Sequence, residues 1–344
     1  MPITATMESS MSTNSIQLAH GGGGLEMNKL IRNLFFKAFD NCILRNEEDA
    51  ALLNLQGPTA FTTDSFTVSP LFFAGGDIGK LAIAGTVNDL AMMGAEPQYL
   101  SLGVIIEEGF PMASLETIVA SMASELKKCG AKIVCGDTKV VPKGCADGLF
   151  LNTTGVGRIV KPGLSAKRLM PGDAILVSGD IGRHGAAILM AREGLELESG
   201  LVSDCATLWG AVEQLLVHPF DIHAMRDATR GGLSAVLNEW AAASDVMIEV
   251  DEAAVPVSDE VKGLCELYGF EATDLANEGT FVMALPAAQA DGALEVLKRF
   301  GHCENAVIIG RVGESPAGRV ILHTPWGSNR YLDLPAGELL PRIC

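Results

Sequence analysis

The sequence predicts an α+β protein of two α/β-type domains followed by a C-terminal tail. The chain has 344 residues, of which 48% are hydrophobic, and at this length two packed cores are favoured over one. Strand-like and helix-like patterns alternate along residues 60–157 and again from residue 174 onward. Between the two series lies the segment 163–173, which follows Pro162, contains Pro171 and is typical of a linker.

The first domain is expected at residues 26–162. Apolar residues at helical spacing predict a helix over 30–39, after which β-type runs alternate with helical ones. The predicted strands are 60–62, 99–106, 132–135 and 149–157, and the predicted helices are 80–93 and 114–129. Residues 1–25 are polar and glycine-rich, so we expect a mobile lead-in there.

The second domain is expected at residues 163–325, with a flexible tail over 326–344. The same patterns predict strands over 174–178, 247–250, 280–285 and 306–312. They predict helices over 185–192, 205–216, 232–243, 258–268 and 287–300. The sequence contains no short internal repeat, which argues against a solenoid fold.

The acidity of the chain excludes several classes of function. It carries 25 Lys and Arg against 42 Asp and Glu, a net charge of −17. This charge repels nucleic-acid phosphates and anionic lipids, and no Lys/Arg-rich run offsets it. No apolar run is long enough to predict a membrane span, and no signal peptide is visible. We therefore expect a cytoplasmic protein that binds neither nucleic acid nor membranes.

Eight cysteines are spread along the chain without a CxxC pair, which favours reduced thiols over disulfides or a structural zinc site. Cys344 differs because it is the last residue, on a segment that Pro335 and Pro341 keep from regular structure. It is either a stray exposed thiol or a reactive thiol on a movable arm, with Arg342 favouring the thiolate. From Tyr331 such an arm would reach about 30 Å, at ~3 Å per residue.

Four aspartates stand where predicted strands end or loops begin. They are Asp64 in FTTDSF, Asp89 in GTVNDLAMMGA, Asp137 in CGDTK and Asp227 in MRDATRGG. Carboxylates that converge on one concave site raise each other's pKa, and a magnesium ion relieves their repulsion. Because Mg²⁺ usually bridges carboxylates to phosphates, a nucleotide is the natural partner. The alternative for each aspartate is an ordinary helix cap or turn residue.

Three glycine-rich segments could bring backbone N–H groups close to phosphate. They are HGGGG at 20–24, FFAGGDIGK at 72–80 and TRGG at 229–232. The second does not fit a Walker A loop, since Ala74 stands where the first glycine belongs and Leu81 follows Lys80. The first can equally be a flexible linker. A GxSxG elbow is absent from the sequence, which excludes an α/β-hydrolase.

The acid–base candidates are Lys139 in GDTK, His184 in SGDIGRHG and Glu278 in LANEGT. Each on its own is most simply a solvated charge or a structural histidine. Each gains weight only if it borders the aspartates.

Taken in order, eight segments resemble the HypE family of hydrogenase maturation factors. They are HGGGG, FTTDSF, GGDIGKLAIAGTVNDLAMMGA, GDTKVV, SGDIGRHG, MRDATRGGL, LANEGT and the terminal PRIC. That family belongs to the superfamily of aminoimidazole-ribotide synthetase, selenophosphate synthetase and thiamine-monophosphate kinase. The resemblance runs from His20 to Cys344. Its most specific part is GDTKVV together with the terminal PRIC.

The resemblance implies the aminoimidazole-ribotide-synthetase-like fold, with strands of two N-terminal domains closing a barrel in a homodimer. It also implies that Cys344 receives a carbamoyl group from the partner HypF, and that ATP drives dehydration of this group to a thiocyanate. The cyanide then passes to iron on a HypC–HypD complex and becomes a ligand of the [NiFe]-hydrogenase centre.

The same resemblance gives the site residues their expected roles. The residues expected at the nucleotide are Asp64, Asp89, Asp137, Asp227, Lys80, Asn88, Gly136 and Thr138, of which Asp64, Asp89 and Asp227 would hold Mg²⁺ with ATP. Lys139 would stabilise charge on the carbamoyl oxygen or the phosphate. Glu278 would be the base for the amide nitrogen, and His184 is a second candidate.

Two other functions fit part of the sequence. A relative that phosphorylates a free small molecule, as selenophosphate and aminoimidazole-ribotide synthetases do, would share the aspartates but have no use for Cys344. A non-enzymatic carrier thiol would need neither ATP nor the aspartates.

Overall fold

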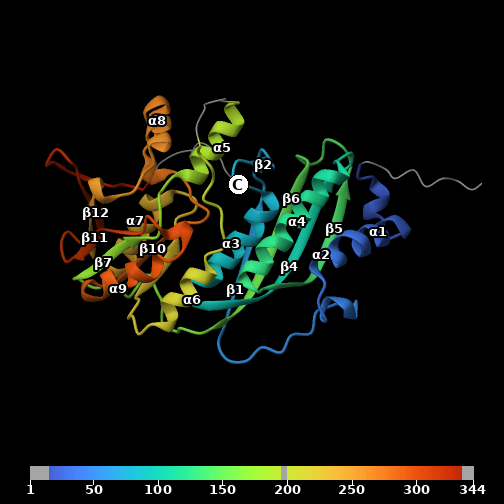
Figure 1. Cartoon of the computed structure of the whole chain (residues 1–344), viewed down its shortest axis with the longest axis horizontal. Coiled ribbons are helices and arrows are strands. Elements are labelled where there is room, and N and C mark those ends of the chain that lie inside the picture. Colours follow the sequence, from blue (N-terminus) through green and yellow to red (C-terminus); the bar gives the residue numbers. More distant parts are fainter. Residues whose placement is uncertain (1–14, 195–199, 335–344) are drawn as a thin grey trace, which may run out of the picture.

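A computed structural model describes residues 15–194 and 200–334 of the chain. It contains two α/β bodies, one ending at residue 159 and the other beginning at residue 173 (Figure 1). The segment between them, residues 160–172, contains no helix or strand. The predicted α+β class with two domains is confirmed. No helix in the described part of the chain is long and apolar enough to cross a membrane.

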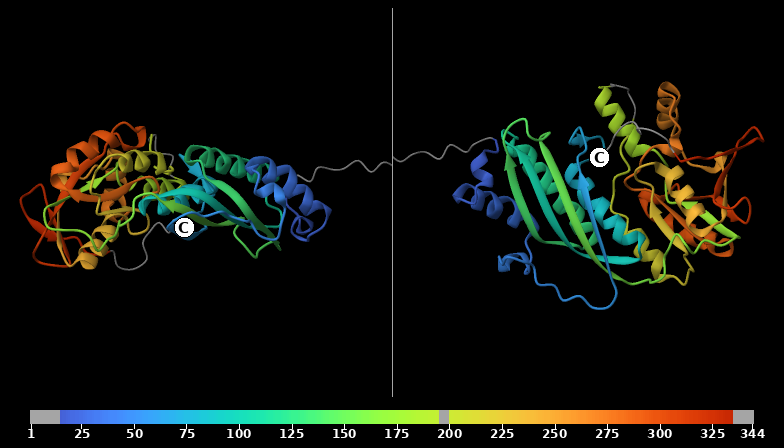
Figure 2. Two further views of the ribbon diagram at one scale, coloured as in Figure 1. Left: turned by 90° about the horizontal axis from the view of Figure 1, so that it is seen from below. Right: turned by 180° about the vertical axis from the view of Figure 1, so that it is seen from behind.

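The N-terminal domain is a four-stranded sheet with helices on one face (Figure 2). The strands in spatial order are β1 (Thr59–Phe66), β6 (Leu149–Ile159), β4 (Ala95–Glu107) and β5 (Lys132–Val141). Strands β4 and β5 run parallel, and the other neighbouring pairs run antiparallel. The helices are α3 (Ile78–Met92) and α4 (Met112–Cys129), preceded by a small hairpin of β2 (Phe72–Phe73) and β3 (Gly76–Asp77).

Close packing of α3 on α4 depends on a glycine. A Cβ added to Gly79 would lie 2.5 Å from the carbonyl oxygen of Ile118. The start of α3 is fixed by Asp77, whose carboxylate accepts the N–H groups of Gly79 and Lys80. The first turn of α3 is therefore held against α4 and in register with the sheet.

The other face of this sheet carries no helix and is called the open face, defined by Phe61, Thr63, Ile105, Cys135 and Thr154. The strand register places Thr63 opposite Thr154, on the side of the sheet away from α3. Phe61 is 71% exposed and Ile105 is 43% exposed. Large apolar side chains on an uncovered sheet face are typical of a protein–protein contact.

The described part of the N-terminal segment differs from the expected mobile lead-in. Ile16 is fully buried, and its N–H donates to the carbonyl oxygen of Phe110 at 2.7 Å. The 3₁₀ turn η1 (Leu18–Gly21) lies against β5, where a Cβ on Gly21 would meet the backbone nitrogen of Val140 at 2.7 Å. Glycine here permits close packing rather than flexibility.

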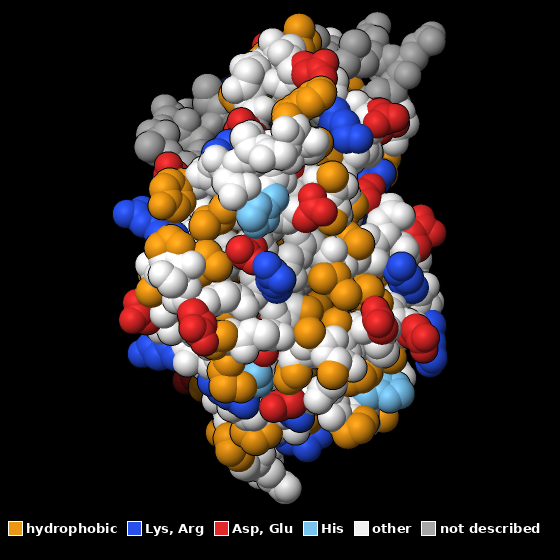
Figure 3. Space-filling model, turned by 90° about the vertical axis from the view of Figure 1, so that its left-hand side faces the viewer, with side chains coloured by type: hydrophobic (Ala, Val, Ile, Leu, Met, Phe, Trp, Pro, Cys, Tyr) orange, Lys and Arg blue, Asp and Glu red, His pale blue; other side chains and the backbone are white. Residues whose placement is uncertain are grey.

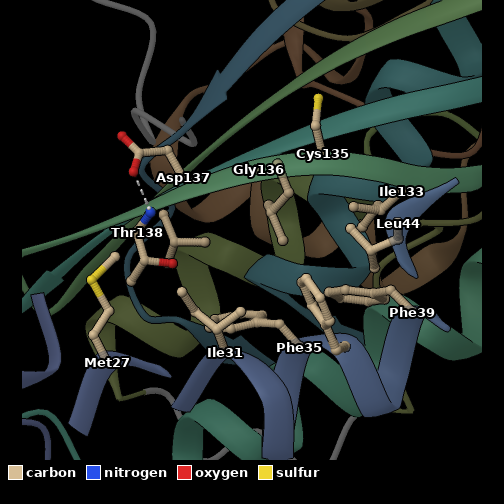
Figure 4. Close-up of a pocket in the computed structure, with 13 residues that line it drawn as sticks. Met27, Ile31, Phe35, Phe39, Leu44, Ile133, Cys135, Gly136, Asp137 and Thr138 are labelled. Atoms are coloured by element: carbon tan, nitrogen blue, oxygen red, sulfur yellow. Dashed lines mark hydrogen bonds between the residues drawn. The ribbon is translucent and has the colours of Figure 1, made fainter. Parts of the chain in front are cut away.

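A helical stretch follows η1 and covers β5 on the α3 side. It consists of α1 (Leu25–Leu30), the π-helical turn η2 (Ile31–Phe36) and α2 (Lys37–Phe39), and the 3₁₀ turn η3 (Leu44–Asn46) comes next. The predicted helix over 30–39 lies within it. Its apolar side chains line a small pocket under β5 (Figure 4).

The C-terminal domain is a seven-stranded sheet between two helical layers. In spatial order its strands are β13 (Asn329–Tyr331), β12 (Arg319–His323), β9 (Met247–Asp251), β11 (Val307–Gly313), β7 (Asp173–Val177), β10 (Phe281–Pro286) and β8 (Ala224–Asp227). Its helices are α5 (Arg183–Glu193), α6 (Trp209–Val217), α7 (Gly232–Ser244), α8 (Asp259–Tyr268) and α9 (Ala287–Leu297). Three 3₁₀ turns complete it: η4 (Glu252–Ala254), η5 (Ala272–Asp274) and η6 (Gly301–Cys303).

The two faces of this sheet belong to different cores. Helices α6 and α9 share one apolar core with the N-terminal domain, whereas α7 packs on the opposite face with Trp240 at its centre. The face of the molecule that Figure 3 shows has acidic and basic side chains interspersed. The net charge of −17 is therefore not gathered into a single patch on that face.

The strands and helices predicted from the sequence are present, with ends shifted by a few residues. The helix predicted over 205–216 begins only at Trp209, and the side chain of Asn88 accepts the N–H of Leu208 just before it. Strands β8, β12 and β13, which have 4, 5 and 3 residues, are not among the predicted ones.

Trp240→Ala tests the core of the C-terminal domain. Trp240 is 1% exposed, so its removal leaves a large cavity, and we expect a loss of about 3–5 kcal/mol in the free energy of unfolding. Urea denaturation measures this loss. Trp326→Ala is the matched control, because Trp326 is 92% exposed and its loss should change stability by less than about 0.5 kcal/mol. Equal effects of the two changes would contradict the described packing.

Candidate active site

Four of the acidic residues that the sequence suggests lie in one hollow between the two domains. Asp64 comes from β1, Asp89 from α3, Asp227 from the end of β8, and Glu278 from the turn before β10. The hollow has a volume of about 250 Å³. Its other lining residues are Thr63, Ser65, Phe66, Gly85, Thr229 and Arg230. Neither domain alone contains the whole hollow.

The two aspartates of the N-terminal domain are fixed by neighbouring threonines. Strand register places Asp64 opposite Thr153, on the sheet face that α3 covers. Thr86 of α3 donates its hydroxyl to Asp64 Oδ2 at 3.4 Å and contacts Thr153 Oγ1 at 2.5 Å. Thr62 donates its hydroxyl to Asp89 Oδ2 at 2.6 Å. Both carboxylates are thus aimed at the same side of the sheet.

Burial and mutual repulsion disfavour the charged forms of these acids. Burial, and next the charge of Asp89, raises the pKa of Asp64 to about 6. The same two causes raise the pKa of Asp227 to about 7. Burial, followed by the charge of Asp227, raises the pKa of Glu278 well above its ordinary value. Arg230 opposes these shifts at Asp64 and Glu278.

The hollow offers oxygen ligands but not a closed cage. Within the described residues, no group of three or more His, Cys, Asp and Glu side chains is arranged to hold a metal ion by itself. The donors at Asp64, Asp89 and Asp227 are carboxylate oxygens, which Mg²⁺ prefers, and Mg²⁺ commonly takes the rest of its ligands from water and phosphate. An added divalent cation would remove the repulsion that raises these pKa values.

The turn that carries Glu278 is held through its backbone. The N–H groups of Glu278 and Gly279 donate to the carboxylate of Asp204 at 3.0–3.2 Å. Asn88 donates to the carbonyl oxygens of Ala206 at 3.0 Å and Glu278 at 3.4 Å. Asn88, expected at the nucleotide, therefore has its amide engaged with backbone groups. No motif in the sequence singles out Asp204, which stands in the charge-poor stretch LVSDCATLWG.

Lys80 and His184 lie outside the lining of the hollow. Lys80 donates through Nζ to the carbonyl oxygen of Gly75 at 2.8 Å. His184 is fully buried, and its Nδ1 shares a hydrogen bond of 2.8 Å with Ser203. Burial lowers the pKa of His184 to about 3, so the imidazole is neutral. Its Nε2 has no hydrogen-bond partner within the described ranges.

The GDTK residues are separated from the acidic hollow within one chain. Asp137 and Lys139 form an exposed ion pair of 2.9 Å on β5, which is three strands from β1. At ~4.8 Å per strand this separation is about 14 Å. Register places both side chains on the open face, opposite to the face of Asp64.

Gly136 and Thr138 also lie on β5, next to the packed HGGGG segment. They line the pocket under β5, whose apolar residues come from α1, η2, α2, η3 and the strands β4 and β5, while Asp137 points to the other side of the strand (Figure 4). The Thr138 N–H donates to Asp137 Oδ1 at 2.9 Å. Two groups of expected site residues therefore exist, the acidic hollow and a β5 segment beside Gly21. Cys344 lies outside the described residues.

Comparison with known proteins places both domains in one family. The sequence-family model "AIR synthase related protein, N-terminal domain" matches residues 47–159. The family model of the corresponding C-terminal domain matches residues 170–323. "Carbamoyl dehydratase HypE" of Escherichia coli (strain K12) is 49% identical over 338 residues, covering 96% of this chain and 100% of that protein. The Azotobacter vinelandii protein of the same name is 45% identical over 337 residues, covering 97% and 98%.

Solved structures agree with these relatives. A hydrogenase maturation protein HypE crystallised in complex with ATP matches with a TM-score of 0.92 and 48% identity, covering 95% of this chain and 99% of that one. HypE from a HypE–HypF complex matches with a TM-score of 0.78 and 47% identity, covering 89% and 99%. A thiamine-monophosphate kinase from Stenotrophomonas maltophilia K279a, with a TM-score of 0.62 and 23% identity over 87% and 96%, shares the fold.

Asp227→Asn tests the electrostatics of the hollow. Because the pKa of Asp227 is raised from 3.8 to about 7 in the folded chain, the folded state loses stability as the pH rises from about 4 to about 7, and the neutral amide removes this effect. Without divalent cations, the variant should exceed the wild type in unfolding free energy by up to about 4 kcal/mol at pH 8, at ~1.36 kcal/mol per pKa unit. The difference should shrink steadily towards pH 4. Urea titrations at several pH values check this, and a pH-independent difference would rule out the raised pKa.

Proposed function

The chain belongs to the AIR synthase related family and, within it, to the carbamoyl dehydratases named HypE, and from this we propose that it dehydrates a carbamoyl group on its own Cys344 with ATP. The product would be a thiocyanate that supplies the cyanide ligands of the [NiFe]-hydrogenase iron. HypF would donate the carbamoyl group, and a HypC–HypD complex would accept the cyanide. Support for HypF and ATP comes from the relatives crystallised with them.

The proposed reaction converts an amide oxygen into a leaving group. The carbamoyl oxygen of Cys344–S–C(=O)NH₂ attacks the γ-phosphorus of ATP, ADP leaves, and one N–H proton is lost. When the second N–H proton is lost, the C–O bond breaks and phosphate leaves with the carbamoyl oxygen. The C≡N triple bond of the thiocyanate forms in the same step. The overall balance is carbamoyl-cysteine plus ATP giving thiocyanate-cysteine, ADP and phosphate. Two protons at nitrogen therefore need an acceptor.

The observation that carries this proposal is the convergence of Asp64, Asp89, Asp227 and Glu278 on one hollow. We assign the three aspartates to a Mg²⁺ ion that would neutralise the phosphates of ATP when bound. Glu278 has a raised pKa and faces the same hollow, which suits a group that accepts a proton from nitrogen. His184 is less suited, because it is buried away from the hollow.

A homodimer would complete the site from a second chain. In the dimer that we propose, two four-stranded sheets would close into a barrel with β5 of one copy beside β1 of the other, since β1 and β5 are the free edges of the sheet. This arrangement would cover the open face and pair those edges. The partner's Lys139 and the segment 136–138 would then border the acidic hollow. Lys139 has a flexible four-carbon stem that can pass the strand edge towards a phosphate or carbamoyl oxygen.

Intact-protein mass spectrometry tests the dehydration on Cys344. After incubation with HypF and its carbamoyl-donor substrates, the wild type should gain one carbamoyl group, and Mg-ATP should then remove one water. Cys344→Ala should gain nothing, while its ATP binding stays unchanged. Absence of an adduct on the wild type, or an adduct on both proteins, would contradict the proposal and favour a kinase acting on a free small molecule.

Mixing two slow variants tests the shared site. Chains with Lys139→Ala and chains with Glu278→Gln should each dehydrate slowly as homodimers. In a mixed population half of the dimers are heterodimers, and one of their two sites has both residues intact, so activity should return to about one quarter of the wild-type rate. No recovery on mixing, although heterodimers form, would mean that Lys139 and Glu278 do not act together across the interface.

A further inference from the structure

The loop before α6 contains a carboxylate that the proposed reaction does not use. Asp204 lies between residue 200 and Trp209, in a segment without helix or strand. It does not line the acidic hollow. Burial raises the pKa of Asp204, although backbone N–H groups of Glu278 and Gly279 oppose the shift. A buried carboxylate beside other carboxylates is costly, so its contacts need an explanation.

The Asp204 carboxylate is bound by the turn that carries Glu278 and by Thr280, which follows this turn. The Glu278 N–H donates to both of its oxygens at 3.2 Å, and the Gly279 N–H donates to Oδ2 at 3.0 Å. The loop packs so closely on the turn that position 279 has no room for a side chain. A Cβ on Gly279 would lie 1.8 Å from the carbonyl oxygen of Asp204. The loop and the turn are therefore in direct backbone contact.

Two asparagines complete this support. Asn277 accepts the Gly182 N–H at 2.6 Å and donates to the carbonyl oxygen of Ala228 at 2.8 Å, next to Asp227. Asn88, on α3 with Asp89, donates to the carbonyl oxygen of Glu278. The backbone of residues 277–279 is thus tied to the segments that carry the proposed metal ligands, while the Glu278 side chain is left to face the hollow.

We propose that Asp204 is a positioning residue, which fixes the 277–279 turn so that the Glu278 carboxylate faces the reacting group. This inference rests on the proposed role of Glu278 as the base. Asp204 does not line the hollow, so it would act only through Glu278. Groups that support a reacting residue in this way commonly change activity by 10- to 100-fold when removed.

Single-turnover dehydration of the carbamoylated protein measures the effect. Asp204→Ala should lower the rate by about 10- to 100-fold, with the dissociation constant for Mg-ATP changed by less than about twofold. Asp204→Asn should keep more activity, because its amide oxygen can still accept one N–H. Asp173→Asn is the matched control: Asp173 is also a buried carboxylate that accepts a backbone N–H, from Met170 at 2.9 Å, but it bonds His223 and lies outside the hollow.

A double-mutant cycle separates positioning from general destabilisation. If Asp204 acts through Glu278, adding Asp204→Ala to Glu278→Gln should slow the reaction no further. If Asp204→Ala slows the Glu278→Gln enzyme by another 10-fold or more, Asp204 does not act through Glu278 and the positioning role is wrong. The assignment of Glu278 as the base would still stand. A normal rate in Glu278→Gln alone would instead refute the base assignment, and with it this role. Should Asp204→Ala fail to fold, the same cycle applies to Asp204→Asn.

Discussion

Unpaired negative charge in a confined space is the constraint on which the rest of the structure depends. Asp64, Asp89, Asp227 and Glu278 share one hollow with a single arginine, Arg230, in its lining. Burial and mutual repulsion raise the pKa of three of them, so ionisation of all four carboxyl groups is electrostatically unfavourable. A cation with a phosphate ligand would remove this penalty, which gives the chain a physical reason to bind Mg-ATP there.

The two domains hold the carboxylates in place against this repulsion. The threonines around Asp64 and Asp89 orient those side chains from within the N-terminal domain, one from β1 and one from α3. The Glu278 turn is fixed across the domain boundary by Asn88 and Asp204. Both domains also share an apolar core through α6 and α9, so the hollow is built on a continuous scaffold. Preorganised groups of this kind do not need to rearrange when charge develops.

Much of the fold was accessible from the sequence, because long runs with period 2 or 3.6 mark β4, β6 and α4 clearly. The aspartates were expected to meet because they stand where predicted strands end or loops begin, but only Asp227 does so; Asp64 lies within β1 and Asp89 within α3, and the packing of α3 on the sheet brings them together. The position of Lys139 was not, since the spatial order of strands in a sheet leaves no local pattern and places β5 three strands from β1. Asp204 was missed because accepting backbone N–H groups requires no motif.

The glycines at 21–24 allowed both flexibility and close packing, and only the contact of Gly21 with Val140 decides between them.

Equilibrium titration of ATP against the wild type and Asp227→Asn, each with and without Mg²⁺ at pH 8, tests the electrostatic origin of nucleotide binding most directly. We expect the wild type to bind ATP tightly only with Mg²⁺, and the variant to lose at least about tenfold in affinity for Mg-ATP. Without Mg²⁺ the variant should bind ATP no more weakly than the wild type, because one repelling charge is gone. Tight binding by the wild type without Mg²⁺, or unchanged Mg-ATP affinity in Asp227→Asn, would contradict this explanation.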